Sequence, residues 1–292
     1  MSLMEINEEV LLELINVEFH YPGNSNSLLK NVNFSIKPGE KKGIIGDNGS
    51  GKSTIAKLFL GLYSPQNGTV NLFGKKVKWG HHYPQLGYIG DPAYKPGQLG
   101  LPIGISVKEV VELFQETWLF STTKSNLVNF KSQLKYLQNQ LNIADFNDRD
   151  VSDLSKGQRM KLMAFLALGK NPLLLIADEA TEGLDADSLK TVISAVMQAS
   201  KHQKIGMLWI SHRRYEVAML TDKIYQLSEG KLSETCLEKF RLSVQTEPDI
   251  DIFSGKNFID LLTSKDVCFD LMGHLFTESS VSKFRLEGIR EE

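Results

Sequence analysis

The sequence predicts an α/β fold with a mostly parallel sheet, an antiparallel β subdomain and an inserted α-helical subdomain. Three observations indicate this class. Short segments near the N-terminus alternate between apolar and polar residues, as half-exposed antiparallel strands do. Residues 173–177 form an uninterrupted apolar run, which is typical of a strand buried on both faces of a parallel sheet. Two amphipathic helical patterns lie between these regions.

The N-terminal part is β-rich and contains one helix. Its strands alternate with period two, and a Pro38-Gly39 turn separates the second strand from the third. The predicted elements are strands at residues 12–21, 32–36, 43–45, 68–73 and 86–89 and a helix at residues 53–62.

A helical subdomain is predicted over about residues 91–157. Its first part, residues 91–105, is rich in proline and glycine and reads as a loop. A helix then covers residues 106–114, with Ser106 as its N-cap, and a second amphipathic helix covers residues 127–141.

The remaining elements return to an α/β pattern. They are helices at residues 161–168 and 188–199, strands at residues 173–177 and 205–210, and a final hairpin at residues 224–232. This pattern stops near Thr235. We therefore expect one domain over residues 1–235 and an appendage of unknown role over residues 236–292.

Composition limits the function classes. The 292-residue chain is 41% hydrophobic and 23% charged, as an ordinary globular protein is, and its formal charge of −2 gives no support for a nucleic-acid surface. No apolar stretch is long enough to span a membrane, and the acidic N-terminus is unlike a signal peptide. Cys236 and Cys268 have no metal-ligand spacing, so a reducing cytoplasm is the simplest expectation.

A glycine-rich motif of the form G-x-x-x-x-G-K-[ST] lies between a predicted strand and a predicted helix. Its residues, with the threonine that follows, are Gly46, Asp47, Asn48, Gly49, Ser50, Gly51, Lys52, Ser53 and Thr54. The glycines allow successive N–H groups to point into one concavity that binds phosphate. Lys52 would reach the β- and γ-phosphates, and the Ser53 hydroxyl would ligate Mg²⁺. The motif predicts a P-loop NTPase core.

Two acids, Asp178 and Glu179, follow the buried strand at residues 173–177. At the C-terminal end of a strand beside the P-loop, Asp178 is suited to hold Mg²⁺ and its waters. Glu179 is suited to orient or deprotonate the water that attacks the γ-phosphate. The alternative is a capping pair for the next helix. Tyr21, at the end of the first strand, would stack on adenine or simply cover the sheet edge.

Residues 154–158, Leu-Ser-Lys-Gly-Gln, resemble the L-S-G-G-Q signature of ATP-binding cassette (ABC) ATPases. The Asp178-Glu179 pair, Gly183-Leu184-Asp185 and Ser211-His212 follow in the order that this family has for Walker B, the D-loop and the switch histidine. The resemblance covers about residues 12–235.

The resemblance implies a head-to-tail homodimer or paralogous heterodimer in which ATP lies between the P-loop of one subunit and the signature of the other. The signature residues are Ser155, Lys156, Gly157 and Gln158. Tyr21 becomes the adenine-stacking residue, Lys52, Glu179 and His212 the catalytic residues, and Asp185 a dimer contact. Without the family, His212 would be a structural residue and Asp185 a helix N-terminal acid.

The implied function is ATP hydrolysis that drives transport through a separate membrane-spanning partner. The ATPase would lie peripherally on the cytoplasmic face of the membrane, bind ATP and Mg²⁺, and bind no nucleic acid. Two departures from the family pattern resemble its exporter-type members. Lys156 replaces the usual third-position glycine, and Asp91 stands where members usually carry a glutamine that contacts Mg²⁺. Asp91 is thus a further candidate ligand.

Two other readings compete with the transport ATPase. A soluble ABC ATPase acting on ribosomes or nucleic acid would usually have two cassettes or a long coiled coil, and neither is visible in the sequence. An ATP-binding regulator with little hydrolysis would explain Asp91 and Lys156, but Glu179 and His212 argue against it.

Overall fold

The computed structural model describes residues 10–24, 26–81, 83–90, 101–102, 104–121, 127–202, 204–235, 239–246, 258–263 and 281–289. Asp91 and both cysteines, Cys236 and Cys268, lie outside the described residues, so what the sequence predicts for them stays a prediction. In the part of the chain that is described, none of the helices has the length and apolar character needed to cross a bilayer.

A six-stranded sheet with the order β10-β9-β3-β8-β7-β6 forms the centre of the molecule. Its strands are β3 (Lys41–Ile45), β6 (Leu86–Gly90), β7 (Leu174–Asp178), β8 (Gly206–Ile210), β9 (Lys223–Ser228) and β10 (Lys231–Thr235). All neighbours pair in parallel except β10, which joins the edge antiparallel to β9. Every residue of β7 and β8 is buried, as their apolar sequences predicted.

A strand–loop–helix unit leads from β3 into α1 (Lys52–Phe59). The helix begins after Gly51, whose φ of 106° is accessible to glycine at little cost. Helix α1 packs against both β4 and β7, and its buried residues Ile55, Leu58 and Phe59 belong to a core that both sheets share. This packing fixes the loop before α1 at the end of the central sheet.

A smaller antiparallel sheet has the order β2-β1-β4-β5. Its strands are β1 (Leu12–Phe19), β2 (Leu29–Ile36), β4 (Asn67–Leu72) and β5 (Lys75–Lys76). Asn16, with φ of 49°, shifts the register of β1, so that Leu14 and Val17 are both buried although they are three positions apart. Asparagine tolerates this left-handed conformation better than most residues do.

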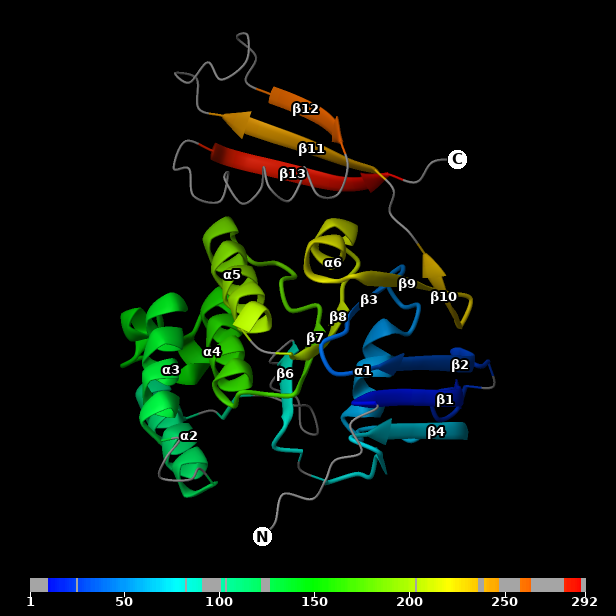
Figure 1. Cartoon of the computed structure of the whole chain (residues 1–292), viewed down its shortest axis with the longest axis horizontal. Coiled ribbons are helices and arrows are strands. Elements are labelled where there is room, and N and C mark those ends of the chain that lie inside the picture. The colour runs from blue at the N-terminus through cyan, green and yellow to red at the C-terminus, as the bar shows by residue number, and fades with distance from the viewer. Residues whose placement is uncertain are drawn as a thin grey trace.

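Apart from α1, the helices lie on the side of the central sheet away from the antiparallel sheet (Figure 1). They are α2 (Val107–Ser121), α3 (Leu127–Gln140), α4 (Lys156–Gly169) and α5 (Ala186–His202), with α6 (Arg214–Leu220) beside β3. Ser106 begins α2 as predicted: its Oγ accepts from the Glu109 N–H at 3.2 Å, and the Glu109 carboxylate accepts from the Ser106 N–H at 2.7 Å. The predicted α/β fold class is confirmed.

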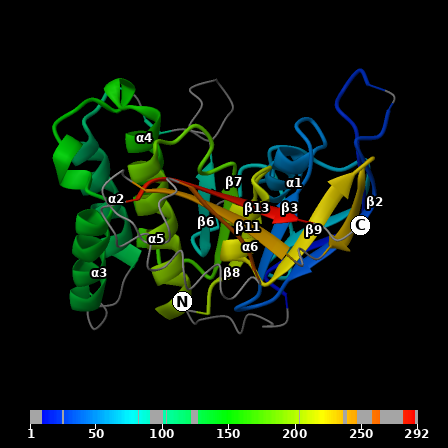
Figure 2. The same cartoon turned by 90° about the horizontal axis from the view of Figure 1, so that it is seen from above.

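A separate three-stranded antiparallel sheet follows the central domain, with the order β12-β11-β13. Its strands are β11 (Lys239–Thr246), β12 (Phe258–Thr263) and β13 (Val281–Ile289). The sheet passes over α5 and α6, and β13 lies against α6 (Figures 1 and 2). It therefore occupies the end of the molecule opposite to the connection between β4 and β6.

Candidate functional site

The P-loop connects β3 to α1 and carries the first part of the site. Lys52, which is 5% exposed, donates from Nζ to the carbonyl oxygens of Gly46 at 2.8 Å and Asp47 at 3.0 Å. The Ser50 hydroxyl is buried and has no hydrogen-bond partner among the described residues. An unpartnered buried hydroxyl and a buried ammonium group in the same loop fit a phosphate, because phosphate oxygens would accept from both groups.

A direct contact links the P-loop to the end of β7. The Ser53 hydroxyl donates to Oδ1 of Asp178 at 3.0 Å. Burial raises the pKa of the Asp178 carboxyl to about 6; the neighbouring charge of Glu179 adds to the rise and the Ser53 hydrogen bond opposes it. A buried carboxylate next to a hydroxyl is an oxygen pair that suits Mg²⁺, which takes one or two carboxylates together with substrate phosphates.

Glu179 lies between Lys52 and His212. Its Oε2 accepts from Nδ1 of His212 at 2.9 Å, and its Oε1 lies 3.8 Å from Nζ of Lys52. Because a carboxylate only accepts, the Nδ1 of His212 carries the proton. The Glu179 backbone has φ of 48°, a conformation that is strained for glutamate, and its N–H donates to the Ile210 carbonyl at 2.9 Å. This backbone geometry directs the side chain toward the P-loop.

Glu216, which was not predicted from the sequence, connects the loops that carry Glu179 and His212. The residue is fully buried, and its carboxylate accepts from Arg213 at 3.0 Å, from the Ser211 hydroxyl at 3.2 Å and from the Thr181 hydroxyl. Ser211 precedes His212, and Thr181 lies two residues after Glu179. A buried carboxylate with three donors therefore ties together the two loops that carry Glu179 and His212. The sequence feature that could have indicated a buried carboxylate here is the position of this glutamate next to the apolar Val217.

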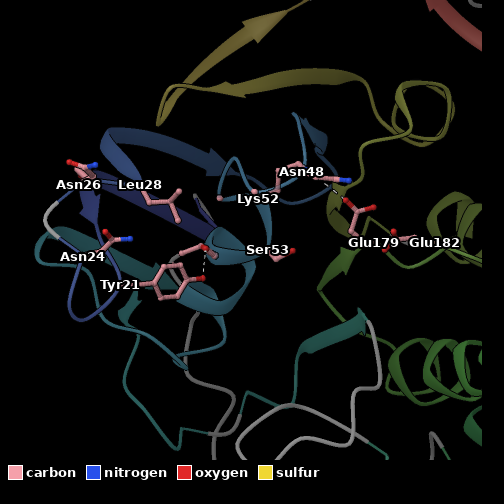
Figure 3. Close-up of a pocket in the computed structure, with 13 residues that line it drawn as sticks. Tyr21, Asn24, Asn26, Leu28, Asn48, Lys52, Ser53, Glu179 and Glu182 are labelled. Atoms are coloured by element: carbon pink, nitrogen blue, oxygen red, sulfur yellow. Dashed lines mark hydrogen bonds and ion pairs between the residues drawn. The ribbon is translucent and has the colours of Figure 1, made fainter.

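A pocket of about 660 Å³ joins the P-loop to Tyr21. The Tyr21 hydroxyl is 2.8 Å from the Thr54 hydroxyl, and its ring makes edge contacts with Phe19 and Tyr63. Figure 3 shows Tyr21 at one end of the pocket and Glu179 at the other, with Lys52 and Ser53 between them. The volume suits a small-molecule ligand. Lining residues that the sequence analysis missed are Asn24, Asn26, Ser27, Leu28 and Glu182.

The signature motif lies elsewhere in the chain and does not line this pocket. Ser155 caps α4: its hydroxyl accepts from the Gln158 N–H at 3.2 Å, and the Gln158 side chain accepts from the Ser155 N–H at 3.1 Å. A Cβ on Gly157 would lie 2.4 Å from the Ser188 hydroxyl oxygen, so only glycine fits at this position.

The D-loop packs against the signature motif of the same chain. Asp185 accepts from the Ser188 N–H and hydroxyl, both at 2.9 Å, and these bonds hold the pKa of its carboxyl below the ordinary value. A Cβ on Gly183 would lie 3.3 Å from Nζ of Lys156, which places the Lys156 side chain over this loop. The signature and the D-loop therefore form one surface.

The described residues contain no group of three His, Cys, Asp or Glu side chains that would hold a metal ion by themselves. Taken together, the strand–loop–helix unit, the buried lysine and the carboxylates at the adjacent strand end define a P-loop ATPase.

Comparisons with known proteins identify the family. The family model for the ABC transporter matches residues 29–182. The chain is 30% identical over 204 residues to the zinc uptake system ATP-binding protein ZurA of Listeria monocytogenes, a match that covers 69% of this chain and 76% of that protein. It is 32% identical over 248 residues to the energy-coupling factor transporter ATP-binding protein EcfA1 of Mycoplasma genitalium, covering 81% and 86%.

A solved structure of an ATP-binding subunit of an ABC transporter has the same fold, with a TM-score of 0.65 and 23% identity over 78% of this chain and 90% of that one. The chain belongs to the ABC transporter family. It is the ATP-hydrolysing subunit, which drives transport across a membrane through a membrane-spanning partner. These relatives do not favour the ribosome or nucleic-acid alternative. The exporter-type resemblance stays a prediction.

Proposed function

We propose that the 660 Å³ pocket binds one ATP between Tyr21 and Glu179. The Tyr21 ring, held by Thr54 and by its two aromatic neighbours, stacks on the adenine. Lys52 and the N–H groups at the start of α1 hold the phosphates, with the helix dipole adding to the attraction. The phosphate-binding residues are Gly46, Asp47, Asn48, Gly49, Ser50, Gly51, Lys52, Ser53 and Thr54.

Ser53 and Asp178 would hold Mg²⁺. Their contact of 3.0 Å and the burial of Asp178 support this assignment, because a cation offsets the cost of an ionised carboxylate away from water. Mg²⁺ would neutralise phosphate charge and make the terminal phosphate a better electrophile. Asp91 stays a further candidate ligand.

Glu179 acts as the general base, and the single observation that carries this proposal is its 2.9 Å bond to His212. That bond and Lys52 on its other side fix the carboxylate beside the phosphate end of the pocket. The carboxylate accepts a proton from the attacking water. His212, with its proton on Nδ1, donates to Glu179 and keeps it in place beside the terminal phosphate.

Hydrolysis is proposed to need a second subunit, either a copy of this chain or a paralogue. Ser155, Lys156, Gly157 and Gln158 stand at the N-terminus of α4, where N–H groups and the helix dipole favour an anion. These residues do not line the pocket of their own chain, which supports the proposal that they bind the ATP held by the partner subunit's P-loop. Asp185 lies on the same surface as a dimer contact.

The subunit is proposed to bind peripherally at the cytoplasmic face of the membrane. A groove of about 280 Å³ between β6 and α4, lined by Tyr88, Met163 and Lys170 among others, would receive a short helix of the membrane-spanning partner. Residues 1–235 would form the ATPase domain, with its helical subdomain at about 91–157, and residues 236–292 a regulatory or dimer-stabilising appendage.

The test is the Glu179→Gln variant. Steady-state ATP hydrolysis should fall by about 10²-fold or more, since a positioned base contributes at least this much. ATP binding should persist, and the variant should form an ATP-dependent dimer on size-exclusion chromatography. Glu182→Gln is the matched control, because Glu182 lines the same pocket without a proposed role. Equal turnover in wild type and Glu179→Gln would refute the base assignment.

A further inference from the structure

An exposed basic loop lies between β4 and β6. We define the basic loop as residues 75–81, Lys-Lys-Val-Lys-Trp-Gly-His. Trp79 is 81% exposed, the most exposed large hydrophobic residue in the described part of the chain. Lys75, Lys76 and Lys78 are also exposed. Trp79 and these three lysines do not line the proposed ATP pocket, so ATP binding does not explain their exposure.

The backbone holds the basic loop in this exposed position. Phe73 and Gly74 have φ of 50° and 71°, as a tight hairpin turn requires, and they pair β5 with β4. The Val77 N–H donates to Val70 at 2.8 Å, and the His81 N–H closes a turn onto the Lys78 carbonyl at 3.3 Å. Trp79 therefore sits at the tip of a constrained turn, so that binding there would cost little ordering of the backbone.

The charge around the loop has one sign. Between Asp47 and Asp91 the sequence contains five lysines and no aspartate or glutamate. None of the three loop lysines forms an ion pair with a described residue. The chain as a whole has a formal charge of −2, so this positive region is local. Its partner should be anionic.

The basic loop borders the groove between β6 and α4. His81 is both the last residue of the loop and part of the groove lining, and its ring lies 6.2 Å from that of Tyr83. The connection from β4 to β6 runs along the edge of the molecule opposite to β11–β13 (Figure 1). If the groove receives the membrane partner, the loop faces the bilayer beside it.

We propose that the basic loop binds anionic phospholipid headgroups, with Trp79 inserted at the membrane–water interface. The amphipathic indole ring of tryptophan prefers this interface, and lysines near it attract anionic lipids. A protein partner fits less well, because lysine is depleted in protein–protein interfaces. The proposal rests on the proposed peripheral membrane location and adds the lipid contact.

Vesicle binding of the full chain tests the proposal. Each lysine should raise partitioning by about fivefold, so a Lys75→Gln/Lys76→Gln/Lys78→Gln variant should lose about 10²-fold. Sedimentation would compare phosphatidylcholine vesicles with vesicles that also contain phosphatidylglycerol. Wild type should bind the second kind, and added salt should release it.

The matched control removes three exposed lysines elsewhere, Lys190→Gln/Lys201→Gln/Lys204→Gln. It should bind vesicles as wild type does. Both triple variants should keep basal ATP hydrolysis, which separates a failure of the loop from a failure of the ATPase assignment. Equal vesicle binding by wild type and the loop variant, or equal loss in both triple variants, would overturn the proposal.

Tryptophan fluorescence tests the insertion itself. In a Trp118→Phe background the remaining tryptophans are Trp79 and the fully buried Trp209. Anionic vesicles should shift the emission to the blue and protect it from iodide, and Trp79→Phe should abolish both effects. Protection in native membranes but not in protein-free vesicles would overturn the lipid assignment in favour of a protein contact.

Discussion

At the scale of single residues, the site depends on two carboxylates in opposite electrostatic situations. Asp178 is buried, the Ser53 hydroxyl is its only side-chain hydrogen-bond donor among the described residues, and burial raises its pKa to about 6. Glu216 is buried with donors from Thr181, Ser211 and Arg213. Asp178 is therefore suited to bind a cation, whereas the hydrogen-bond donors around Glu216 already compensate its charge within the protein.

Asp178→Asn should stabilise the protein at pH 8 in the presence of a chelator. The folded-state pKa of about 6 lies above the ordinary aspartate value, so above pH 6 the folded state carries an ionised, buried carboxylate. That cost is about 3 kcal/mol, and it vanishes as the pH falls from 6 to 4 because the folded state takes up the proton. Thermal unfolding should show a higher Tm for the variant at pH 8 and no difference at pH 4. A Tm gain that does not depend on pH would contradict this.

Glu216→Gln should lower kcat about tenfold while ATP binding stays nearly unchanged. The amide keeps the shape of the side chain but weakens the charge-assisted bonds that hold the Glu179 and His212 loops, and small displacements of reacting groups are costly. Single-turnover hydrolysis and ATP titration would separate the two effects. The exposed Glu112→Gln is the control. A matching loss of ATP affinity would indicate a merely structural role.

At the scale of elements, the sequence predicted what local patterns determine. Apolar runs identified β7 and β8, and Ser106 before a helical pattern identified the start of α2. The register shift at Asn16 and the approach of Asn24 and Asn26 to the pocket were not predicted. They depend on how β1 pairs with both neighbours and where its end meets α1, which only the tertiary structure fixes.

The same limit applies within the site. The P-loop and the Asp178-Glu179 pair are contiguous motifs, so sequence sufficed to propose them. Glu216 acts through partners on two separate segments, and its inward orientation follows from the packing of α6 against β3 and β8. A helical sequence pattern predicts which face of the helix carries such a residue. It does not predict which hydrogen-bond donors contact its side chain.

At the scale of the whole molecule, the proposed sharing of each ATP site between two subunits predicts complementation. Lys52→Ala disables the P-loop, and Ser155→Ala disables the signature surface. Each variant alone should hydrolyse ATP slowly. In an equal mixture, half of the dimers should combine one intact P-loop with one intact signature and recover about a quarter of wild-type activity. Steady-state ATPase assays of co-refolded or co-expressed variants would measure this, with the double variant as control. No recovery would argue against a homodimer.

The strand order of the central sheet also sets when the protein becomes competent during synthesis. β8 lies between β3 and β7, although it is the last of the three to be made. Ser53 and Asp178 are in contact although they are 125 positions apart in the sequence. The strand β8, which pairs with both β3 and β7, ends only at Ile210. A nascent chain that lacks β8 has two unpaired strand edges where the pocket should form. Ribosome-bound chains should therefore first acquire ATP binding after β8 has left the exit tunnel.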